Sequence, residues 1–144
     1  MCRGALRPIL EHVRRAADEA SPERRVPLLV KIAPDLADAD VDAVAALAVE
    51  LKLDGVAAVN TTIAHDRGPG GVSGPVLLPR ALEVVGRLRS GLGPEACIMG
   101  MGGISTAEDA RALLDAGATL VQAYTGFVYG GPMWPARINR KLAN

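Results

Sequence analysis

Aromatic side chains are scarce in this chain of 144 residues, which contains one Trp, two Tyr and one Phe. Proteins that bind single-stranded nucleic acid stack bases on aromatic rings, so this scarcity argues against that class. An excess of one charge is also lacking, because 16 basic residues balance 16 acidic residues. A nucleic-acid-binding surface would need a basic stripe, and the sequence does not provide one.

Cysteine and histidine are equally rare. Cys2 and Cys97 form neither a disulfide framework nor a metal-ligand cluster, and Cys97 lies in an apolar run where we expect it to be buried as a small hydrophobic residue. His12 falls on the polar side of a predicted helix, and His65 falls in a loop where we expect it to be solvated. The sequence therefore predicts no metal site.

Long apolar runs are missing too. No run approaches the roughly 18 residues of a membrane-spanning helix, and the first residues do not resemble a secretory signal. We therefore expect a reducing cytoplasmic setting. Membrane association through a region outside this sequence stays open.

What the sequence does contain is an alternation of strand-like and helix-like segments, with 49% apolar residues to build the core of one domain. The four predicted strands are 28–33, 55–60, 96–100 and 119–123. The predicted helices are 5–20, a segment from Asp38 or Asp40 to Leu51, 80–90, 105–117 and 133–143. The strands are almost continuously apolar, as in a parallel sheet covered by helices. The pattern fits half of an eight-stranded βα-barrel or a small open α/β sheet.

Two of the helices carry more detailed signals. The segment 5–20 repeats apolar residues at helical spacing, so we expect one buried face opposite a charged face. The buried face would contain Leu6, Ile9, Leu10 and Val13, and the charged face Glu11, Arg14, Arg15 and Asp18. The segment Ser105–Glu108 predicts a capping box at a helix start, and Gly117 is a good residue to end that helix.

Polar residues at the ends of the first two strands are candidates for function, because functional side chains of a βα-barrel cluster at the carboxyl ends of its strands. Lys31 interrupts an apolar run, and it either reaches water or points into the barrel mouth at a ligand that gains negative charge. The run Asn60–Thr62 either builds a turn or reads a small polar ring through its amide and hydroxyls.

Three glycine-containing segments are candidates for binding a ligand through the backbone. The run Gly70–Gly74 lies in a long loop and either lies against a flat ligand or phosphate or is simply mobile. Gly100–Ile104 follows the third strand, and Tyr124–Gly126 follows the fourth. Loops after the last two strands of a βα-barrel commonly bind phosphate through backbone N–H groups, so these two segments together predict a phosphate-bearing ligand.

Taken together, these segments resemble the C-terminal half of the dihydroorotate dehydrogenases, and specifically the quinone-dependent class. The matching stretches, in the family's order and spacing, are Val30–Leu36, Asn60–Thr62, Gly70–Gly74, Gly100–Ser105 and Gly117–Gly126. The string Lys-Ile-Ala-Pro-Asp-Leu is the most specific and favours the quinone-dependent type. Gly131–Pro132 fits as well.

The resemblance implies an α/β fold in which residues 1–144 form the C-terminal half of a (βα)8 barrel, with about four βα units of parallel strands and without the N-terminal half. It implies FMN as cofactor, oxidation of dihydroorotate to orotate in pyrimidine synthesis, and quinone as electron acceptor. It also implies one of two locations, in the cytoplasm or at the periphery of the inner membrane. In a half-barrel two strand edges are open, so we expect an N-terminal partner or self-association.

The resemblance also assigns roles by position. The cofactor-binding residues would be Lys31, Val59, Gly74, Gly103, Tyr124 and Thr125, and the substrate-binding residues Asn60 and Thr61. Among these, the lysine would lie near flavin N1 and the C2 carbonyl, and the Tyr-Thr pair would bind the FMN phosphate through backbone N–H groups.

Departures from the family limit what the chain can do. The family's catalytic base is a serine upstream of the matched region, so no catalytic residue is assigned, and Ser73 belongs to the glycine loop. Val76 stands where proline is common and Met101 where valine is common. We therefore expect little or no dihydroorotate oxidation by this chain alone.

Two other readings compete with an oxidoreductase. One is a non-catalytic FMN- or phosphate-binding half-barrel. The other is a sugar-phosphate or thiamine-phosphate barrel, which would not explain the Lys31 string together with Asn60–Thr62.

Overall fold

The computed structural model describes residues 2–143, with the side chains of residues 2 and 3 left out, so the expectation for Cys2 lies outside the described residues. The strands are β1 (Leu29–Ile32), β2 (Gly55–Ala58), β3 (Cys97–Met101) and β4 (Leu120–Gln122). The helices are α1 (Cys2–Ala20), α2 (Asp38–Glu50), the 3-10 turn η1 (Pro75–Leu77), α3 (Leu78–Leu92), α4 (Ala107–Asp115), α5 (Thr125–Gly130) and α6 (Trp134–Leu142).

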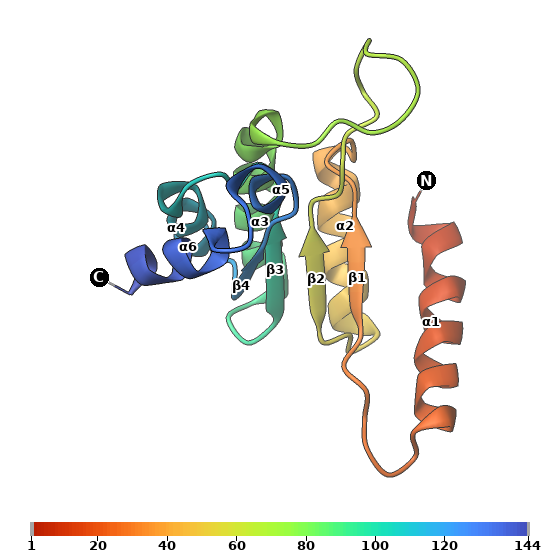
Figure 1. Ribbon diagram of the computed structural model, residues 1–144. Coiled ribbons are helices and arrows are strands. Elements are labelled where there is room, and N and C mark those ends of the chain that lie inside the picture. Colours follow the sequence, from red (N-terminus) through yellow and green to blue (C-terminus); the bar gives the residue numbers. More distant parts are fainter. Residues whose placement is uncertain (1, 144) are drawn as a thin grey trace.

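The four strands form one parallel sheet in the order β1-β2-β3-β4, and a helical segment connects each strand to the next (Figure 1). All four predicted strands are present within one or two residues of their predicted ends. The α/β fold class is confirmed. Within residues 2–143, β1 and β4 each pair on one side only, so both lateral edges of the sheet are open.

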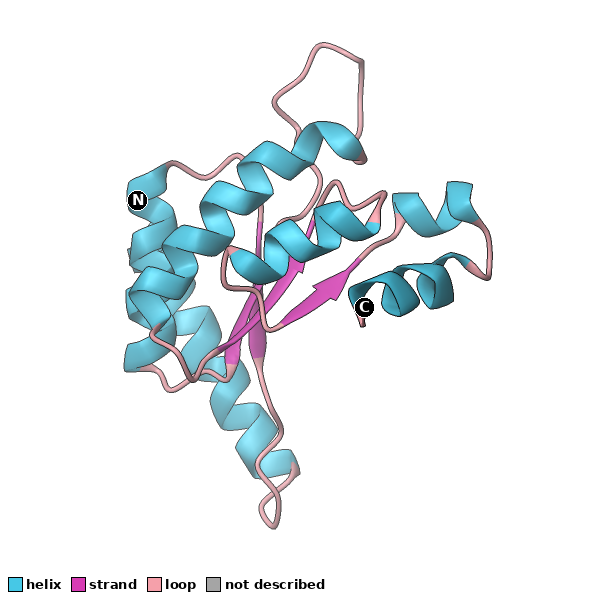
Figure 2. Cartoon of the chain, turned by 90° about the vertical axis from the view of Figure 1, so that its left-hand side faces the viewer, coloured by secondary structure: helices cyan, strands magenta, loops and turns pink. Residues whose placement is uncertain are grey.

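The hydrophobic core lies between one face of this sheet and the helices α2, α3 and α4, which Figure 2 shows as a layer beside the strands. Its fully buried side chains include Val41 and Leu47 of α2, Val84 and Leu88 of α3, and Ile98 of β3. Each such side chain contributes roughly 1.5–3 kcal/mol by leaving water. The sequence forms this layer because apolar residues recur at helical spacing in α2 and α3.

The opposite face of the sheet carries a row of side chains from all four strands. Strand register places Lys31 beside Ala57, Ala57 beside Met99, and Met99 beside Leu120. Neighbours in register point to the same side of a sheet, so Lys31 faces away from the helical layer. At the end of this row Leu120 is 54% exposed. The strands are therefore apolar on both faces, while the described helices cover one.

The predicted faces of α1 were only partly right. Leu10 is buried, but Ile9 is 58% exposed and Val13 is 41% exposed. Arg14, predicted to lie on the charged face, is buried because its guanidinium donates to the Val26 carbonyl at 2.8 Å and pairs with Asp18. A long aliphatic stem allows this arrangement, which helical spacing alone does not reveal.

Two predicted helix caps were wrong. The capping box of α4 uses Thr106 with Asp109, one residue later than the predicted pair Ser105 and Glu108. Helix α2 has Ala37 at its N-cap and no side-chain cap, so neither Asp38 nor Asp40 occupies that position. Gly117 follows α4 with φ +115°, which confirms that prediction.

Other differences concern segments that lack periodic apolar residues. The short helix α5 and the turn η1 were not predicted, and α3 is two residues longer than predicted at each end. Cys97 is a free thiol and is half-buried rather than buried. His12 is exposed, as expected. No helix among the described residues has the length and hydropathy needed to cross a membrane.

Candidate functional site

The carboxyl ends of the four strands surround a pocket of about 390 Å³. All eight residues predicted to bind cofactor or substrate line it: Lys31, Val59, Asn60, Thr61, Gly74, Gly103, Tyr124 and Thr125. These residues come from four separate segments, and the parallel sheet brings the segments together at one edge. The sequence therefore predicted which residues meet at this pocket.

Three polar side chains at the pocket lack partners within the described part of the chain. Lys31, Asn60 and Thr61 line the pocket, and their side chains form no hydrogen bond or ion pair with residues 2–143. A cation, an amide and a hydroxyl without internal partners are available to a ligand. Because Lys31 lies on the helix-free face of the sheet, its ammonium lies at the floor of that pocket rather than in the core.

Glycine is required where the loop after β3 passes α3. Gly103 has φ +84°, and a Cβ placed on it would lie 2.5 Å from the backbone N of Leu78. Gly74 also has a positive φ of +93° and lies next to Thr125 across the pocket. These glycines let backbone form the pocket wall directly, which suits a phosphate or a flat ring.

A side-chain contact joins the Gly70–Gly74 segment to the residues that follow β4. The Ser73 and Thr125 hydroxyls lie 2.8 Å apart, within hydrogen-bond distance. Thr125 is the first residue of α5, which follows β4 after Ala123 and Tyr124. Behind this helix the Trp134 indole N–H donates to the Ser105 carbonyl at 3.0 Å. Ser73 thus supports the pocket wall by its contact with Thr125.

The loop that follows Asn60, residues 60–74, is anchored at its base by Asp35. The Asp35 carboxylate accepts hydrogen bonds from the Thr62 hydroxyl and, at 2.9 Å, from the Ile63 N–H. Those bonds, first from Thr62 and then from Ile63, lower the pKa of the Asp35 carboxyl. Thr62 also pairs with Val72 in an isolated antiparallel bridge. The 60–74 loop extends beyond the carboxyl edge of the sheet (Figures 1 and 2).

His65 has a more defined place than the solvated one predicted. Its Nδ1 accepts from the Arg67 N–H at 3.1 Å, and its Nε2 lies 2.9 Å from the Gly70 carbonyl. In this pairing Nδ1 is the acceptor and Nε2 faces an acceptor. The histidine closes the tip of the 60–74 loop, away from the pocket-lining residues.

Some pocket residues were not singled out from the sequence. These are Leu77, Gln122 and Ala123. Gln122 carried a usable signal, because it is a polar residue inside the last apolar run, as Lys31 is in the first. The apolar members carried none. No group of His, Cys, Asp and Glu suited to a metal occurs among the described residues.

Comparison with known proteins identifies the family. The sequence model described as "Dihydroorotate dehydrogenase" matches residues 5–144. The chain belongs to the dihydroorotate dehydrogenase family. The resemblance drawn from the strand-end residues is thereby confirmed.

Curated relatives point to the quinone-dependent class. The chain is 55% identical to the "Dihydroorotate dehydrogenase (quinone)" of Thermobifida fusca (strain YX), over 96% of this chain and 39% of that protein. It is 57% identical to the protein of the same name from Nocardioides sp. (strain ATCC BAA-499 / JS614), over 96% of this chain and 42% of that one. The chain thus spans about two fifths of the length of these dihydroorotate dehydrogenases.

Solved dihydroorotate dehydrogenase structures share the fold. The crystal structure of the Eimeria tenella enzyme in complex with ferulenol matches with a TM-score of 0.86 and 31% identity, over 97% of this chain and 43% of that one. The ligand-free Eimeria tenella enzyme matches with a TM-score of 0.77 and 35% identity, over 82% of this chain and 35% of that one. The four βα units therefore correspond to part of a βα-barrel.

Proposed function

We propose that residues 1–144 form the C-terminal, FMN-binding part of a quinone-dependent dihydroorotate dehydrogenase. The observation that carries the proposal is the single pocket at the carboxyl edge of the sheet, where all eight expected residues meet. Three of them, Lys31, Asn60 and Thr61, present polar side chains without partners in the described part of the chain. Lys31 and Asn60 are exposed and Thr61 is half-buried, so these groups are free to exchange water for a ligand.

The pocket residues fit FMN in size and in chemistry. A volume of about 390 Å³ lies in the range of small-ligand sites. Gly103 and the Tyr124–Thr125 segment bring backbone to the pocket from the two loops expected to hold the phosphate. Val59 and Gly74 also line the pocket, and Gly74 lies next to Thr125. When bound, FMN supplies the hydride acceptor of the reaction.

In this proposal Lys31 stabilises negative charge that develops on the flavin ring during reduction. The β-strand fixes the backbone of Lys31 beside the pocket, and its flexible side chain can bring the ammonium to that charge. Asn60 and Thr61 hold the dihydroorotate ring by hydrogen bonds. These roles follow the family's pattern at the same positions.

The proton-abstracting step is expected from a serine outside the matched residues. Ser73 is not assigned as that base, because it belongs to the Gly70–Gly74 segment, where its hydroxyl contacts the Thr125 hydroxyl. We therefore expect the 144-residue chain to bind FMN with little or no dihydroorotate oxidation. Non-catalytic flavin binding is the second candidate function. It is favoured by the fact that the chain spans only about two fifths of the length of its relatives.

We further propose that residues 1–144 are one barrel segment whose open edges, β1 and β4, pair with the strands that complete the barrel. The edge strand β4 carries an exposed apolar side chain, Leu120. Without those strands the chain is expected to self-associate. Size-exclusion chromatography over a range of concentrations measures this, and a stable monomer throughout would contradict it.

The test of FMN binding uses Trp134, the one tryptophan of the chain, as a reporter next to the loops at the phosphate end. FMN is titrated while indole emission and flavin emission are followed, and riboflavin serves as the matched ligand without phosphate. We expect FMN to bind more tightly than riboflavin and inorganic phosphate to compete. Absence of binding at high micromolar FMN would reject the proposal for this chain.

A further inference from the structure

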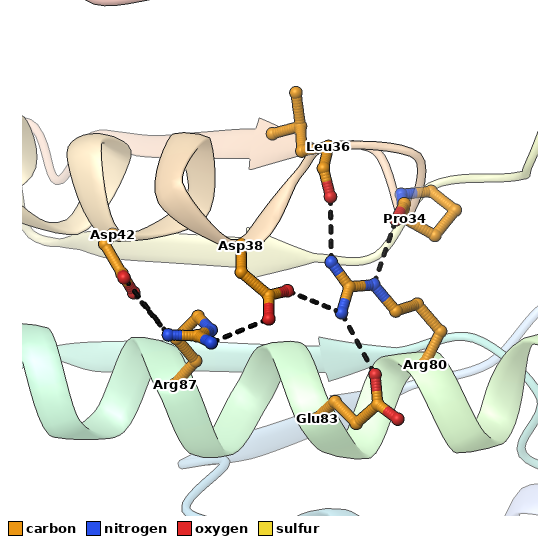
Figure 3. A network of polar contacts seen from close by, with 7 residues as sticks. All are labelled: Pro34, Leu36, Asp38, Asp42, Arg80, Glu83 and Arg87. Atoms are coloured by element: carbon orange, nitrogen blue, oxygen red, sulfur yellow. Dashed lines mark hydrogen bonds and ion pairs between the residues drawn. The ribbon is translucent and has the colours of Figure 1, made fainter.

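A network of charged side chains lies between α2 and α3, close to the pocket but outside it (Figure 3). Its centre is Arg80, whose side chain is 28% exposed. Asp38 lies between Arg80 and Arg87 and pairs with both, at 2.9 Å and 2.7 Å. Surface ion pairs of this kind usually add little stability, so another role for Arg80 has to come from its other contacts.

Arg80 differs from its neighbours because it also binds backbone. Its Nε donates to the Pro34 carbonyl at 3.1 Å, and its Nη2 donates to the Leu36 carbonyl at 2.8 Å. The planar guanidinium of Arg80 thus holds the backbone carbonyls on both sides of Asp35. Lysine could not do this, because its donors leave from a single nitrogen. Figure 3 shows the guanidinium between the two carbonyls and the two carboxylates.

The residue between these carbonyls is Asp35, the anchor of the 60–74 loop. Its carboxylate holds the Thr62 hydroxyl and the Ile63 N–H. The loop residues before these, Asn60 and Thr61, line the pocket. Hydrogen bonds joined by short stretches of backbone therefore link α3, through the turn after β1, to the pocket residues Asn60 and Thr61.

We propose that Arg80 is a positioning residue of the pocket, which acts through Asp35 on the 60–74 loop. It touches no pocket ligand itself. By fixing the turn at Pro34–Leu36, it holds the carboxylate in the place where that group receives the loop's donors. The inference rests on the proposed function only for the identity of the ligand. The connection from Arg80 through Asp35 to the 60–74 loop rests on the observed hydrogen bonds alone.

Amide hydrogen exchange in the full 144-residue chain tests the link without any ligand. The reporters are the amides of Thr62, Ile63 and Val72, each hydrogen-bonded within the loop or to its anchor. In Arg80→Ala we expect these amides to exchange about fivefold faster, the factor that one ordinary hydrogen bond is worth. The matched control is Arg87→Ala, because Arg87 pairs with Asp38 and Asp42 and binds no carbonyl.

Two further variants separate positioning from a general loss of stability. Arg80→Lys keeps the charge beside Asp38 but loses the fork, so we expect its loop amides to exchange almost as fast as in Arg80→Ala. Full protection in the lysine variant would overturn the proposal. Arg89→Ala removes bonds to the Ala96 and Gly117 carbonyls at the other end of the sheet, and it should lower stability without selective exchange in the loop.

A double-mutant cycle with Asp35→Ala closes the argument. If both residues act on one path, Arg80→Ala adds nothing to the loop exchange of Asp35→Ala. Additive effects, or unchanged loop exchange in Arg80→Ala alone, would overturn the proposal. FMN titration of the same variants gives the functional readout, with weaker binding expected for Arg80→Ala than for Arg87→Ala. If the unsubstituted chain binds no FMN, the proposed function fails, and the exchange data still decide the role of Arg80.

Discussion

Replacement of Gly103 by alanine tests whether the pocket wall depends on close contact between the loop after β3 and α3. The residue is buried and has φ +84°, a conformation that residues with a Cβ rarely adopt. An alanine Cβ would lie 2.5 Å from the Leu78 N and 2.7 Å from its Cβ. Ordinary contact needs about 1 Å more, so either the loop or the start of α3 has to shift.

The expected magnitude has two parts. The positive φ costs an alanine roughly 1–2 kcal/mol. Overpacking against Leu78 adds roughly 1–3 kcal/mol, because the obstacle is helix backbone rather than the end of a flexible side chain. We therefore expect Gly103→Ala to lower the free energy of unfolding by about 2–5 kcal/mol.

Gly93 provides the matched control. It has nearly the same φ, +79°, but a Cβ there would meet nothing within 4 Å. Its ψ is 179°, a backbone region occupied almost only by Gly, so Gly93→Ala should cost only the conformational part, roughly 1–3 kcal/mol. With a urea slope of about 1–3 kcal/mol per molar, the midpoints of the two variants should differ by roughly 1 M.

Urea unfolding followed by Trp134 emission measures both variants, and FMN titration in the absence of urea measures the pocket. We expect FMN affinity to fall in Gly103→Ala and to stay unchanged in Gly93→Ala, since the loop displaced by the clash lines the pocket. Equal destabilisation by the two alanines would refute the steric reasoning. Unchanged FMN affinity in a folded Gly103→Ala protein would refute the link to the site.

Three further predictions follow from the same structure. Thr106→Ala should lower the free energy of unfolding by about 1 kcal/mol in urea titrations through loss of the α4 cap, whereas Ser105→Ala should change it little. Lys31→Ala should leave stability unchanged but weaken FMN binding about tenfold, with Lys52→Ala as an exposed control at the other end of the sheet; equal affinities would contradict the assigned role. The pKa of the Asp35 carboxyl is lowered below 3.8, so its support of the loop is complete above that pH and is lost as the pH falls through the lowered value. Protection of the loop amides, measured against their intrinsic exchange rates at each pH, should fall over that range, and Asp35→Asn should remove this change in protection.

The strands and the pocket could be predicted because their signals are local. Each strand is an apolar run, and each pocket residue lies at or just after such a run, where the parallel arrangement brings strand ends together. Lys31 was found because a charge in an apolar run is costly unless it has a purpose. Gln122 offered the same signal at the last strand and lines the same pocket.

The parts that were missed depend on contacts between distant segments. Helix α5 has no buried residue and only six residues, so its sequence lacks the periodicity that identifies longer helices. The α4 cap shifted by one residue because Ser105 and Thr106 are both competent caps, and only the geometry selects one. The burial of Arg14 depends on the Val26 carbonyl, twelve residues away.

The same distinction explains why the pocket-lining residues can be predicted from the sequence, whereas the residues that position them cannot. Residues that touch a ligand are limited in kind, since each must provide a cation, an amide, a hydroxyl or bare backbone at a strand end. Arg80 is a cation but does not lie at a strand end, and in the sequence it is one of three arginines in the segment 78–92. Its two bonds to carbonyls of the turn after β1 give it a specific task, and those bonds join residues more than 40 positions apart. A site can therefore be recognised from short motifs, while the groups that hold it in shape are recognised only from the folded chain.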